Sequence, residues 1–311
     1  MPPIINVNSL TKQFKDIKAV DNLSFTVNQS DVYGFLGQNG AGKSTTIRML
    51  LTLIEPTDGK IEMFGLNLKS HRKEILRQVG AIIERPDLYK YLSGLENLAL
   101  FAKMNGVDSS RKKLMEQLEL VGLADRADSK AKAYSQGMKQ RLGIAIALVH
   151  DPQLVILDEP TNGLDPQGIA DMRNLILHLS RHLKKTIMVS SHLLSEIEQV
   201  ATRMLIIDHG RKIVEGNVDE LVDPSKTLVS LETTDQQGAM HFIQNSIWEA
   251  FLVKPVSDNI LLQIHKDSIP ELNHDLVHAG IGVLSLQAKN SLENYFLQIT
   301  AGKQYVGTFK D

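Results

Sequence analysis

The sequence predicts an α/β fold with a helical insertion, followed by a small α+β domain. Two short runs, Val32–Leu36 and Leu154–Leu157, have the unbroken apolar character of parallel strands that are buried on both faces. A glycine-rich loop and a helical pattern follow the first run, and an acidic pair follows the second. The turn signal Asp223–Pro224 marks a domain boundary. We therefore expect one domain over residues 1–222 and a second over residues 223–311.

Composition limits the class of protein further. The chain has 311 residues, of which 42% are hydrophobic and 23% charged, as in soluble globular proteins. A net charge of −2 argues against a dedicated nucleic-acid binder, which is normally basic. The lack of cysteine excludes disulfides and zinc–thiolate sites, and it fits a reducing compartment. No apolar stretch is long enough to span a membrane, and the N-terminus does not resemble a signal peptide. If the protein acts at a membrane, we therefore expect another protein to hold it there.

The glycine-rich loop has the complete pattern G-x-x-x-x-G-K-S between a predicted strand and a predicted helix. Its glycines allow successive backbone N–H groups to point at phosphate oxygens, and the helix N-terminus adds the positive end of its dipole. We expect Lys43 to reach the β- and γ-phosphates, and the Ser44 hydroxyl to bind Mg²⁺. The residues expected to bind the nucleotide are Gly37, Asn39, Gly40, Ala41, Gly42, Lys43, Ser44 and Thr45.

Further elements are expected in the first domain from the period of their apolar residues. Helical periodicity from Leu95 to Arg126 predicts a helical subdomain over about residues 90–150, inserted into the α/β core. A hairpin turn is expected at Asp208–Gly210. The predicted strands are Ile4–Leu10, Leu23–Val27, Lys60–Met63, Val79–Ile83, Thr186–Ser190, Met204–Ile207 and Lys212–Val214, and the predicted helices are His71–Gln78, Ser135–Val149 and Pro166–Leu179.

The acidic pair Asp158–Glu159 stands where the second buried strand ends, a common position for functional groups in α/β sheets. We expect Asp158 to hold Mg²⁺ through its water shell. Glu159 is expected to orient and deprotonate the attacking water, because a carboxylate is the available base beside a metal-bound phosphate. The sequence thus predicts hydrolysis of a nucleoside triphosphate.

The run Tyr134–Leu142 adds a family resemblance. It is similar to the signature motif of ATP-binding-cassette (ABC) proteins, and residues 4–220 resemble the ATPase subunit of an ABC transporter. Ser135 and the Gly137 amide lie at a helix N-terminus, where they can bind phosphate. In the family this phosphate belongs to ATP on a partner subunit, so the resemblance implies a head-to-tail dimer with two composite sites. Gln136 and Met138 depart from the commonest signature, Leu-Ser-Gly-Gly-Gln, and leave communication with a permease open.

The resemblance assigns roles to three more residues. Asp165 matches the loop that crosses the dimer interface. His192 matches the family's switch histidine, which contacts the γ-phosphate and holds the attacking water with Glu159. Phe14 aligns with the aromatic residue that stacks on adenine; a buried core phenylalanine is the alternative.

Glu84 departs from the family pattern, which usually has glutamine on the loop that meets the membrane subunit. A glutamate here resembles the branch that exports lantibiotics and related peptide antibiotics. The change removes a hydrogen-bond donor and adds negative charge beside Mg²⁺. We hypothesise that Glu84 serves Mg²⁺ coordination and permease coupling; neutral exchange of one polar residue for another is the alternative.

The second domain carries neither a phosphate loop nor a catalytic cluster. Asn290–Leu297 resembles a segment found near the end of exporter-type subunits, which implies a dimer-stabilising or regulatory role. We expect Trp248 to pack in the core. The histidine pairs His178/His182 and His274/His278 are expected to be solvated surface residues. The predicted strands are Thr227–Glu232, Ile260–Ile264 and Gly282–Gln287, and the helices are Ala239–Asn245, Pro270–Ala279 and Leu292–Thr300.

Together these features predict an ATPase that uses ATP and Mg²⁺ to power export of an antibiotic, peptide or lipid-like substrate. Its expected partners are a separate membrane permease and a second copy of itself, with no nucleic acid. The expected location is the cytoplasmic face of the cell membrane, held there by the permease. A soluble ABC protein acting on ribosomes or DNA is a rival, which the single phosphate loop disfavours. A non-hydrolysing regulatory module is another, which the set Lys43, Asp158, Glu159 and His192 disfavours.

Overall fold

The structure, a computed structural model, describes residues 3–221, 227–253 and 260–289. The chain divides into two units, Met1–Asn217 and Val218–Asp311. The boundary expected between residues 222 and 223 touches a stretch outside the described residues.

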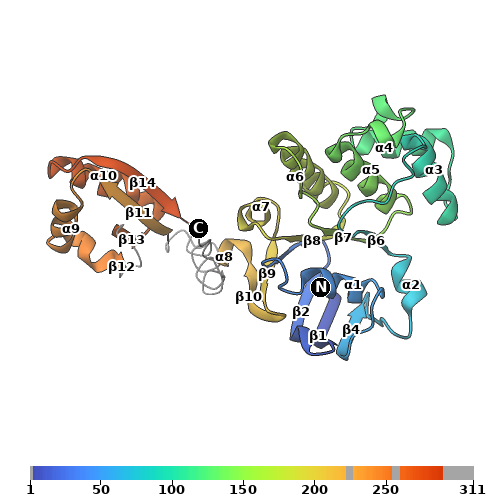
Figure 1. Cartoon of the computed structure of the whole chain (residues 1–311), viewed down its shortest axis with the longest axis horizontal. Coiled ribbons are helices and arrows are strands. Elements are labelled where there is room, and N and C mark those ends of the chain that lie inside the picture. Colours follow the sequence, from blue (N-terminus) through green and yellow to red (C-terminus); the bar gives the residue numbers. More distant parts are fainter. Residues whose placement is uncertain (1–2, 222–226, 254–259, 290–311) are drawn as a thin grey trace, which may run out of the picture. The chain divides into compact units, whose positions relative to one another are not determined.

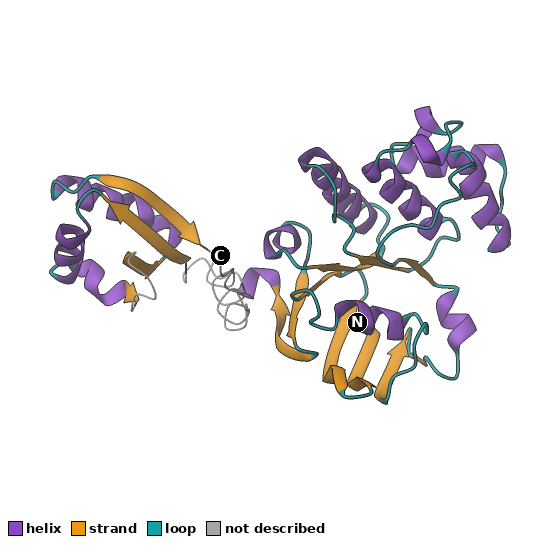
Figure 2. Ribbon diagram, viewed as in Figure 1, coloured by secondary structure: helices purple, strands orange, loops and turns teal. Residues whose placement is uncertain are grey.

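A six-stranded sheet lies at the centre of the first unit (Figure 2). Five neighbouring strands run parallel. The sixth strand, at one edge of the sheet, is antiparallel to its neighbour. In order across the sheet the strands are β10 (Arg211–Asn217), β9 (Arg203–Asp208), β3 (Val32–Leu36), β8 (Thr186–Ser191), β7 (Leu154–Asp158) and β6 (Val79–Ile82). Every residue of β3, β7 and β8 is buried, which explains the apolar runs Val32–Leu36 and Leu154–Leu157. Because they are parallel, their carboxyl ends meet at one edge of the sheet.

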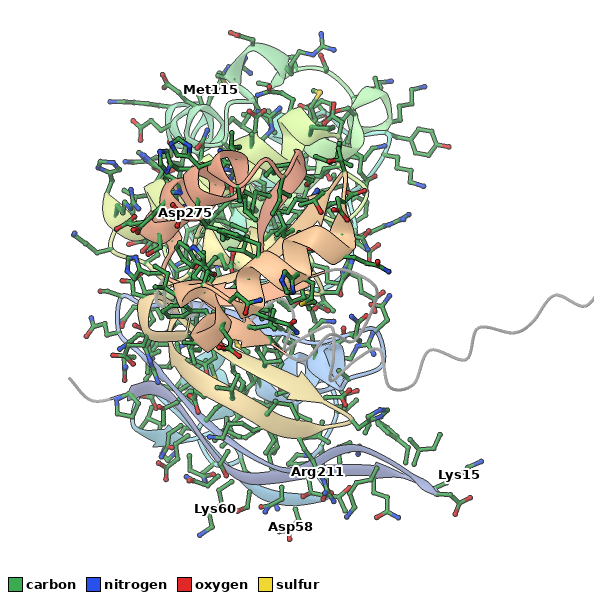
Figure 3. All side chains as sticks on the ribbon, turned by 90° about the vertical axis from the view of Figure 1, so that its left-hand side faces the viewer. Lys15, Asp58, Lys60, Met115, Arg211 and Asp275 are labelled. Atoms are coloured by element: carbon green, nitrogen blue, oxygen red, sulfur yellow. The ribbon has the colours of Figure 1, made fainter. Side chains whose placement is uncertain are left out.

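A second, antiparallel sheet has the strand order β2 (Ile17–Asn28), β1 (Pro3–Phe14), β4 (Asp58–Met63) and β5 (Leu66–Asn67). The first two strands are longer than the predicted Ile4–Leu10 and Leu23–Val27, because the residues between those predictions also pair, up to Phe14 and Ile17. Lys15 lies at the tip of this hairpin (Figure 3). Helix α1 (Lys43–Leu50) lies between the two sheets and buries Ile47 and Leu50 (Figure 1).

The predicted helical stretch forms two helices and a short turn: α3 (Gly94–Met104), α4 (Arg111–Leu120) and η1 (Ala124–Arg126). Ser93 and Glu96 form a capping box at the start of α3. The chain leaves α3 through Gly106, whose φ is 70°. The Asp108 carboxylate then accepts hydrogen bonds from Ser110 N (2.8 Å) and Oγ (3.0 Å) before α4 begins. The apolar period alone did not reveal this break.

The remaining helices of the first unit are α2 (Arg72–Leu76), α5 (Gln136–Leu148), α6 (Pro166–Arg181) and α7 (Leu194–Glu198). Helices α3 to α6 gather on one side of the six-stranded sheet (Figure 1). The predicted hairpin turn is confirmed: His209 and Gly210 link β9 to β10, and both have positive φ, 46° and 76°. The α/β prediction for this unit is therefore confirmed.

In the part that the structure describes, the second unit contains a four-stranded antiparallel sheet and three α-helices. Across the sheet the strands are β12 (Leu252–Val253), β13 (Ile260–Ile264), β11 (Thr227–Thr233) and β14 (Val283–Lys289), and the helices are α8 (Val218–Leu221), α9 (Gln236–Gln244) and α10 (Ile269–His278). Trp248 is buried as predicted, and its indole Nε1 donates to Asp275 Oδ2 at 3.0 Å. The predicted helix at 292–300 lies outside the described residues. In the described ranges of both units, every helix is too short or too polar to cross a bilayer.

Candidate nucleotide-binding and hydrolysis site

The glycine-rich loop connects the end of β3 to the start of α1, as predicted. Gly42 is the N-cap of α1 with a φ of 105°, and a Cβ added there would lie 2.5 Å from the Ala19 carbonyl oxygen. Both the positive φ and this close approach require glycine. The residues predicted to bind the nucleotide all lie between the end of β3 and the first turn of α1: Gly37, Asn39, Gly40, Ala41, Gly42, Lys43, Ser44 and Thr45.

The first turn of α1 supplies backbone donors beside the loop. The Gly42 carbonyl accepts the first helical hydrogen bond, from Thr46 N at 2.9 Å. The amides of Lys43, Ser44 and Thr45 come before that bond, so helix geometry gives them no partner within α1. Such amides, together with the positive end of the helix dipole, bind phosphate. The loop and the helix therefore fit the phosphate chain of a nucleotide.

Lys43 is buried, and its ammonium points back into the loop. Nζ donates to the Gly37 carbonyl oxygen at 2.7 Å and to that of Gln38 at 3.3 Å. The same nitrogen lies 3.2 Å from Oε1 of Glu159. A buried ammonium needs anionic or carbonyl partners, and phosphate oxygens provide equivalent ones. A bound triphosphate would therefore compete with Glu159 for Lys43.

Asp158 ends β7 with one carboxylate oxygen satisfied and the other free. Oδ1 accepts from Ser190 Oγ at 2.5 Å, while Oδ2 is buried without a hydrogen-bond partner among the described residues. Asp158 and Ser44 line the same cavity, of about 520 Å³. Mg²⁺ takes oxygen ligands, and it is usually bound by one or two carboxylates together with substrate phosphates. The free Oδ2 and the Ser44 hydroxyl fit this ion.

The described residues offer no ready-made metal cage elsewhere. No group of three or more His, Asp or Glu side chains is arranged to hold a metal ion in the described part of the chain. The ring centroids of His178 and His182 lie 4.9 Å apart, and those of His274 and His278 lie 4.6 Å apart, so each pair shares a helix face. Two ligands without a third do not make a closed site.

Glu159 and His192 face each other across the ends of β7 and β8. Nδ1 of His192 lies 3.3 Å from Oε2 of Glu159, which is an ion-pair distance without hydrogen-bond alignment. Glu159 has a φ of 46°, and its amide donates to Ser190 Oγ at 2.9 Å. A non-glycine residue in this left-handed region is uncommon and is concentrated at functional sites. The carboxylate of Glu159 thus stands between Lys43 and His192.

Glu84 follows β6 and lines the same cavity as Ser44 and Asp158. Its φ is 58°, and its carboxylate forms an ion pair with Arg48 of α1. The cavity thus holds a third carboxylate, besides Asp158 and Glu159. The pair with Arg48 was not predicted, because the two residues belong to elements far apart in the sequence.

Ser135, Gly137 and Asp165 lie together in a different cavity, of about 380 Å³. Ser135 is the N-cap of α5 and accepts from Met138 N at 3.2 Å; Asp165 is the N-cap of α6 and accepts from Gly168 N at 2.9 Å. This cavity shares no lining residue with the cavity beside the phosphate loop. One chain therefore carries two separate parts of the predicted site.

Phe14 lies at the end of β1 with 45% of its surface exposed, so it is not a core phenylalanine. The Lys12 ammonium lies 4.9 Å from the centre of its ring. An exposed aromatic ring can stack on a base. The adenine role stays a prediction.

Sequence reasoning missed Ser190 as a functional residue. Its hydroxyl donates to Asp158 Oδ1 and accepts from the Glu159 amide, so it fixes both acidic residues. Asn162 was also missed; its Nδ2 donates to Glu159 Oε2 at 3.4 Å. The sequence signal that could have indicated Ser190 is the pair of serines, Ser190 and Ser191, directly before His192.

Known proteins are similar to this chain in sequence and in fold. Residues 20–162, which include the glycine-rich loop and the acidic pair, match a family model described as ABC transporter. The chain is 43% identical to the bacitracin transport ATP-binding protein BcrA of Bacillus licheniformis, over 97% of this chain and 99% of that protein. It is 37% identical to the Nod factor export ATP-binding protein I of Ralstonia nicotianae, over 71% of this chain and 69% of that protein. The ATP-binding cassette MJ0796, solved as a post-hydrolysis dimer bound to ADP and Pi, has a TM-score of 0.62 and 24% identity, over 69% of this chain and 98% of that chain.

Proposed function

Because this chain belongs to the ABC transporter family, we propose that it hydrolyses ATP to power export through a separate membrane permease. The observation that carries the proposal is the contact of Glu159 with both Lys43 and His192, at 3.2 and 3.3 Å. This arrangement provides an anion-binding ammonium, a base and a second polar group at the edge where β7 and β8 end. The permease would hold the chain at the cytoplasmic face of the membrane.

The mechanism follows from these residues. Phosphate oxygens of ATP take over the Lys43 ammonium, and this releases the Glu159 carboxylate. Glu159 accepts a proton from water while the water oxygen attacks the γ-phosphorus, and the bond from that phosphorus to the bridging oxygen of ADP breaks. His192 holds the attacking water and the γ-phosphate. Ser44 and Asp158 would hold Mg²⁺, with Glu84 beside them, and the ion would neutralise negative charge on the phosphates of ATP.

The two separate cavities support a head-to-tail dimer. Ser135 and Gly137 lie at a helix N-terminus, which suits a phosphate, yet their cavity shares no residue with the one beside Lys43. We propose that each ATP is held by the phosphate loop of one copy and by Ser135, Gly137 and Asp165 of the other. The solved dimer of MJ0796 supports this arrangement. Phe14 would stack on adenine.

The substrate class comes from the relatives. The bacitracin transport protein is similar to this chain over nearly the whole length of both. We propose a peptide antibiotic as the exported substrate, with the loop of Glu84 transmitting closure of the dimer to the permease.

Reconstitution in vesicles tests the proposal. The reading frames that neighbour its gene are first searched for a membrane permease; the chain is then purified with that permease, and ATP hydrolysis and movement of bacitracin are measured together. We expect bacitracin-stimulated hydrolysis that Glu159→Gln abolishes, and we expect Glu84→Ala to weaken the coupling between hydrolysis and transport. A wild-type complex without turnover would contradict the ATPase, and Glu84→Ala with normal hydrolysis and transport would contradict the role of Glu84.

A further inference from the structure

Glu196 of α7 connects the two loops that carry Glu159 and His192. Its Oε2 accepts hydrogen bonds from Thr161 Oγ1 at 2.8 Å and from Ser191 Oγ at 2.9 Å. Thr161 follows Glu159 by two positions in the loop after β7, and Ser191 directly precedes His192 at the end of β8. One carboxylate oxygen therefore links the ends of two neighbouring strands.

Ser191 extends this connection around the histidine. Its hydroxyl donates to Glu196 and also accepts from the Leu193 amide at 3.0 Å. His192 lies between these two anchored positions. The backbone on both sides of His192 is thus fixed relative to α7.

The surroundings strengthen these hydrogen bonds. Ser191 is 3% exposed, and apolar residues make up half of the lining of a narrow cavity of about 40 Å³ beside Thr161, Ser191 and Glu196. Hydrogen bonds to a carboxylate are stronger than those between neutral groups, and a low local dielectric strengthens them further. Glu196 itself contacts neither Lys43 nor Glu159 in any interaction that the structure gives for the described residues.

We propose that Glu196 is a positioning residue for hydrolysis, an inference that rests on the proposed ATPase function. By holding Thr161 and Ser191, it sets the 3.3 Å approach of Glu159 to His192. The loop that binds the phosphates belongs to β3 and α1, which Glu196 does not touch through these bonds. Loss of Glu196 therefore lowers kcat and leaves the KM for ATP unchanged.

Three substitutions in the full chain separate geometry from charge. Glu196→Ala removes the acceptor, and we expect kcat to fall roughly 10- to 100-fold with KM for ATP unchanged, because small displacements of catalytic groups have effects of this size. Glu196→Gln keeps a carbonyl oxygen that can accept both hydroxyls, so it restores most of kcat. The matched control Ser195→Ala, on the exposed side of the same short helix, keeps the wild-type rate.

A double-mutant cycle of Thr161→Val and Glu196→Ala tests the link itself. We expect the double variant to be no slower than Glu196→Ala alone, since both changes break one connection. We expect the single variants Thr161→Val and Ser191→Ala each to lower kcat, and thermal unfolding checks that both are folded, so the test does not depend on Glu196→Ala.

The outcomes are distinct. Wild-type turnover with an unchanged kcat in Glu196→Ala overturns the inference and leaves the ATPase intact. A parallel rise in KM, or a Glu196→Gln variant as slow as Glu196→Ala, also overturns it. A wild-type chain without turnover, alone or with its permease, overturns the proposed function as well.

Discussion

At the residue scale, the Lys43–Glu159 contact makes a sharp prediction about binding and chemistry. Glu159→Gln removes the proposed base and also the negative charge 3.2 Å from the Lys43 ammonium. We expect kcat to fall by at least about 100-fold, the lower end of general-base contributions. ATP affinity should stay equal or increase, because phosphate no longer competes with a carboxylate. Steady-state hydrolysis and equilibrium titration with a fluorescent ATP analogue measure the two effects.

Lys43→Ala is the matched comparison, because it removes the other partner of the same contact. We expect this variant to lose ATP affinity, which Glu159→Gln retains. A Glu159→Gln variant that hydrolyses ATP within tenfold of wild type would contradict the assignment of the base.

The Arg48–Glu84 ion pair makes a prediction about Mg²⁺. The side chains are 40% and 62% exposed, so the pair contributes at most about 1 kcal/mol to stability. Arg48→Met releases the Glu84 carboxylate, and we expect half-maximal hydrolysis at a lower Mg²⁺ concentration. Glu84→Gln removes the negative charge and should raise that concentration. Identical Mg²⁺ midpoints in both variants and wild type would exclude a role for Glu84 in Mg²⁺ binding.

At the element scale, His150 joins the end of α5 to the start of β6. Its Nε2 lies 3.2 Å from the Val79 carbonyl oxygen, and its Nδ1 is buried without a partner among the described residues. Burial lowers the pKa of His150 from its ordinary value of 6.5, against the smaller opposing effect of the Val79 hydrogen bond. The folded chain therefore binds this proton less readily than the unfolded chain. Its contribution to stability is present above pH 6.5 and is lost as the pH falls through the lowered pKa.

His150→Gln should consequently flatten the acid dependence of unfolding of the first unit as the pH falls below 6.5. Urea denaturation at several pH values measures the slope. His182→Gln, which changes an exposed histidine, serves as the control and should follow wild type. If His150→Gln also follows wild type, this half-buried histidine has no part in acid unfolding.

The elements show why sequence reasoning succeeded in some places. The glycine-rich loop and the hairpin turn at His209 were predictable because their conformations depend on residues adjacent in the sequence. The buried strands β3 and β7 were predictable because burial on both faces produces an apolar run.

Contacts between elements were not predictable in the same way. The Ser190–Asp158 and Glu196–Thr161 hydrogen bonds depend on β7 and β8 being neighbours, and one sequence does not specify that order. The break after α3 was missed for a local reason: apolar residues keep a helical period across Gly106, although α3 ends at Met104 and Gly106 has a φ of 70°.

At the scale of the whole molecule, two cavities without a shared residue predict that one chain is incomplete. Mixing Lys43→Ala with Ser135→Arg tests this. In a head-to-tail dimer of the two variants, one composite site carries both faults and the other carries none. Each variant alone should be inactive, and an equal mixture should regain up to about a quarter of wild-type hydrolysis if the sites act independently.

The mixture distinguishes shared from self-contained sites, because every chain in it has one fault. If a single chain supplied its whole site, no combination of the two variants would restore activity.

Glu196→Ala mixed with Lys43→Ala provides the matched control. Glu159, His192 and Glu196 belong to the same half of the site as Lys43, so this mixed dimer has two damaged sites, and its rate should stay well below that of the first mixture. Size-exclusion chromatography with ATP then checks that both mixtures form dimers to the same extent.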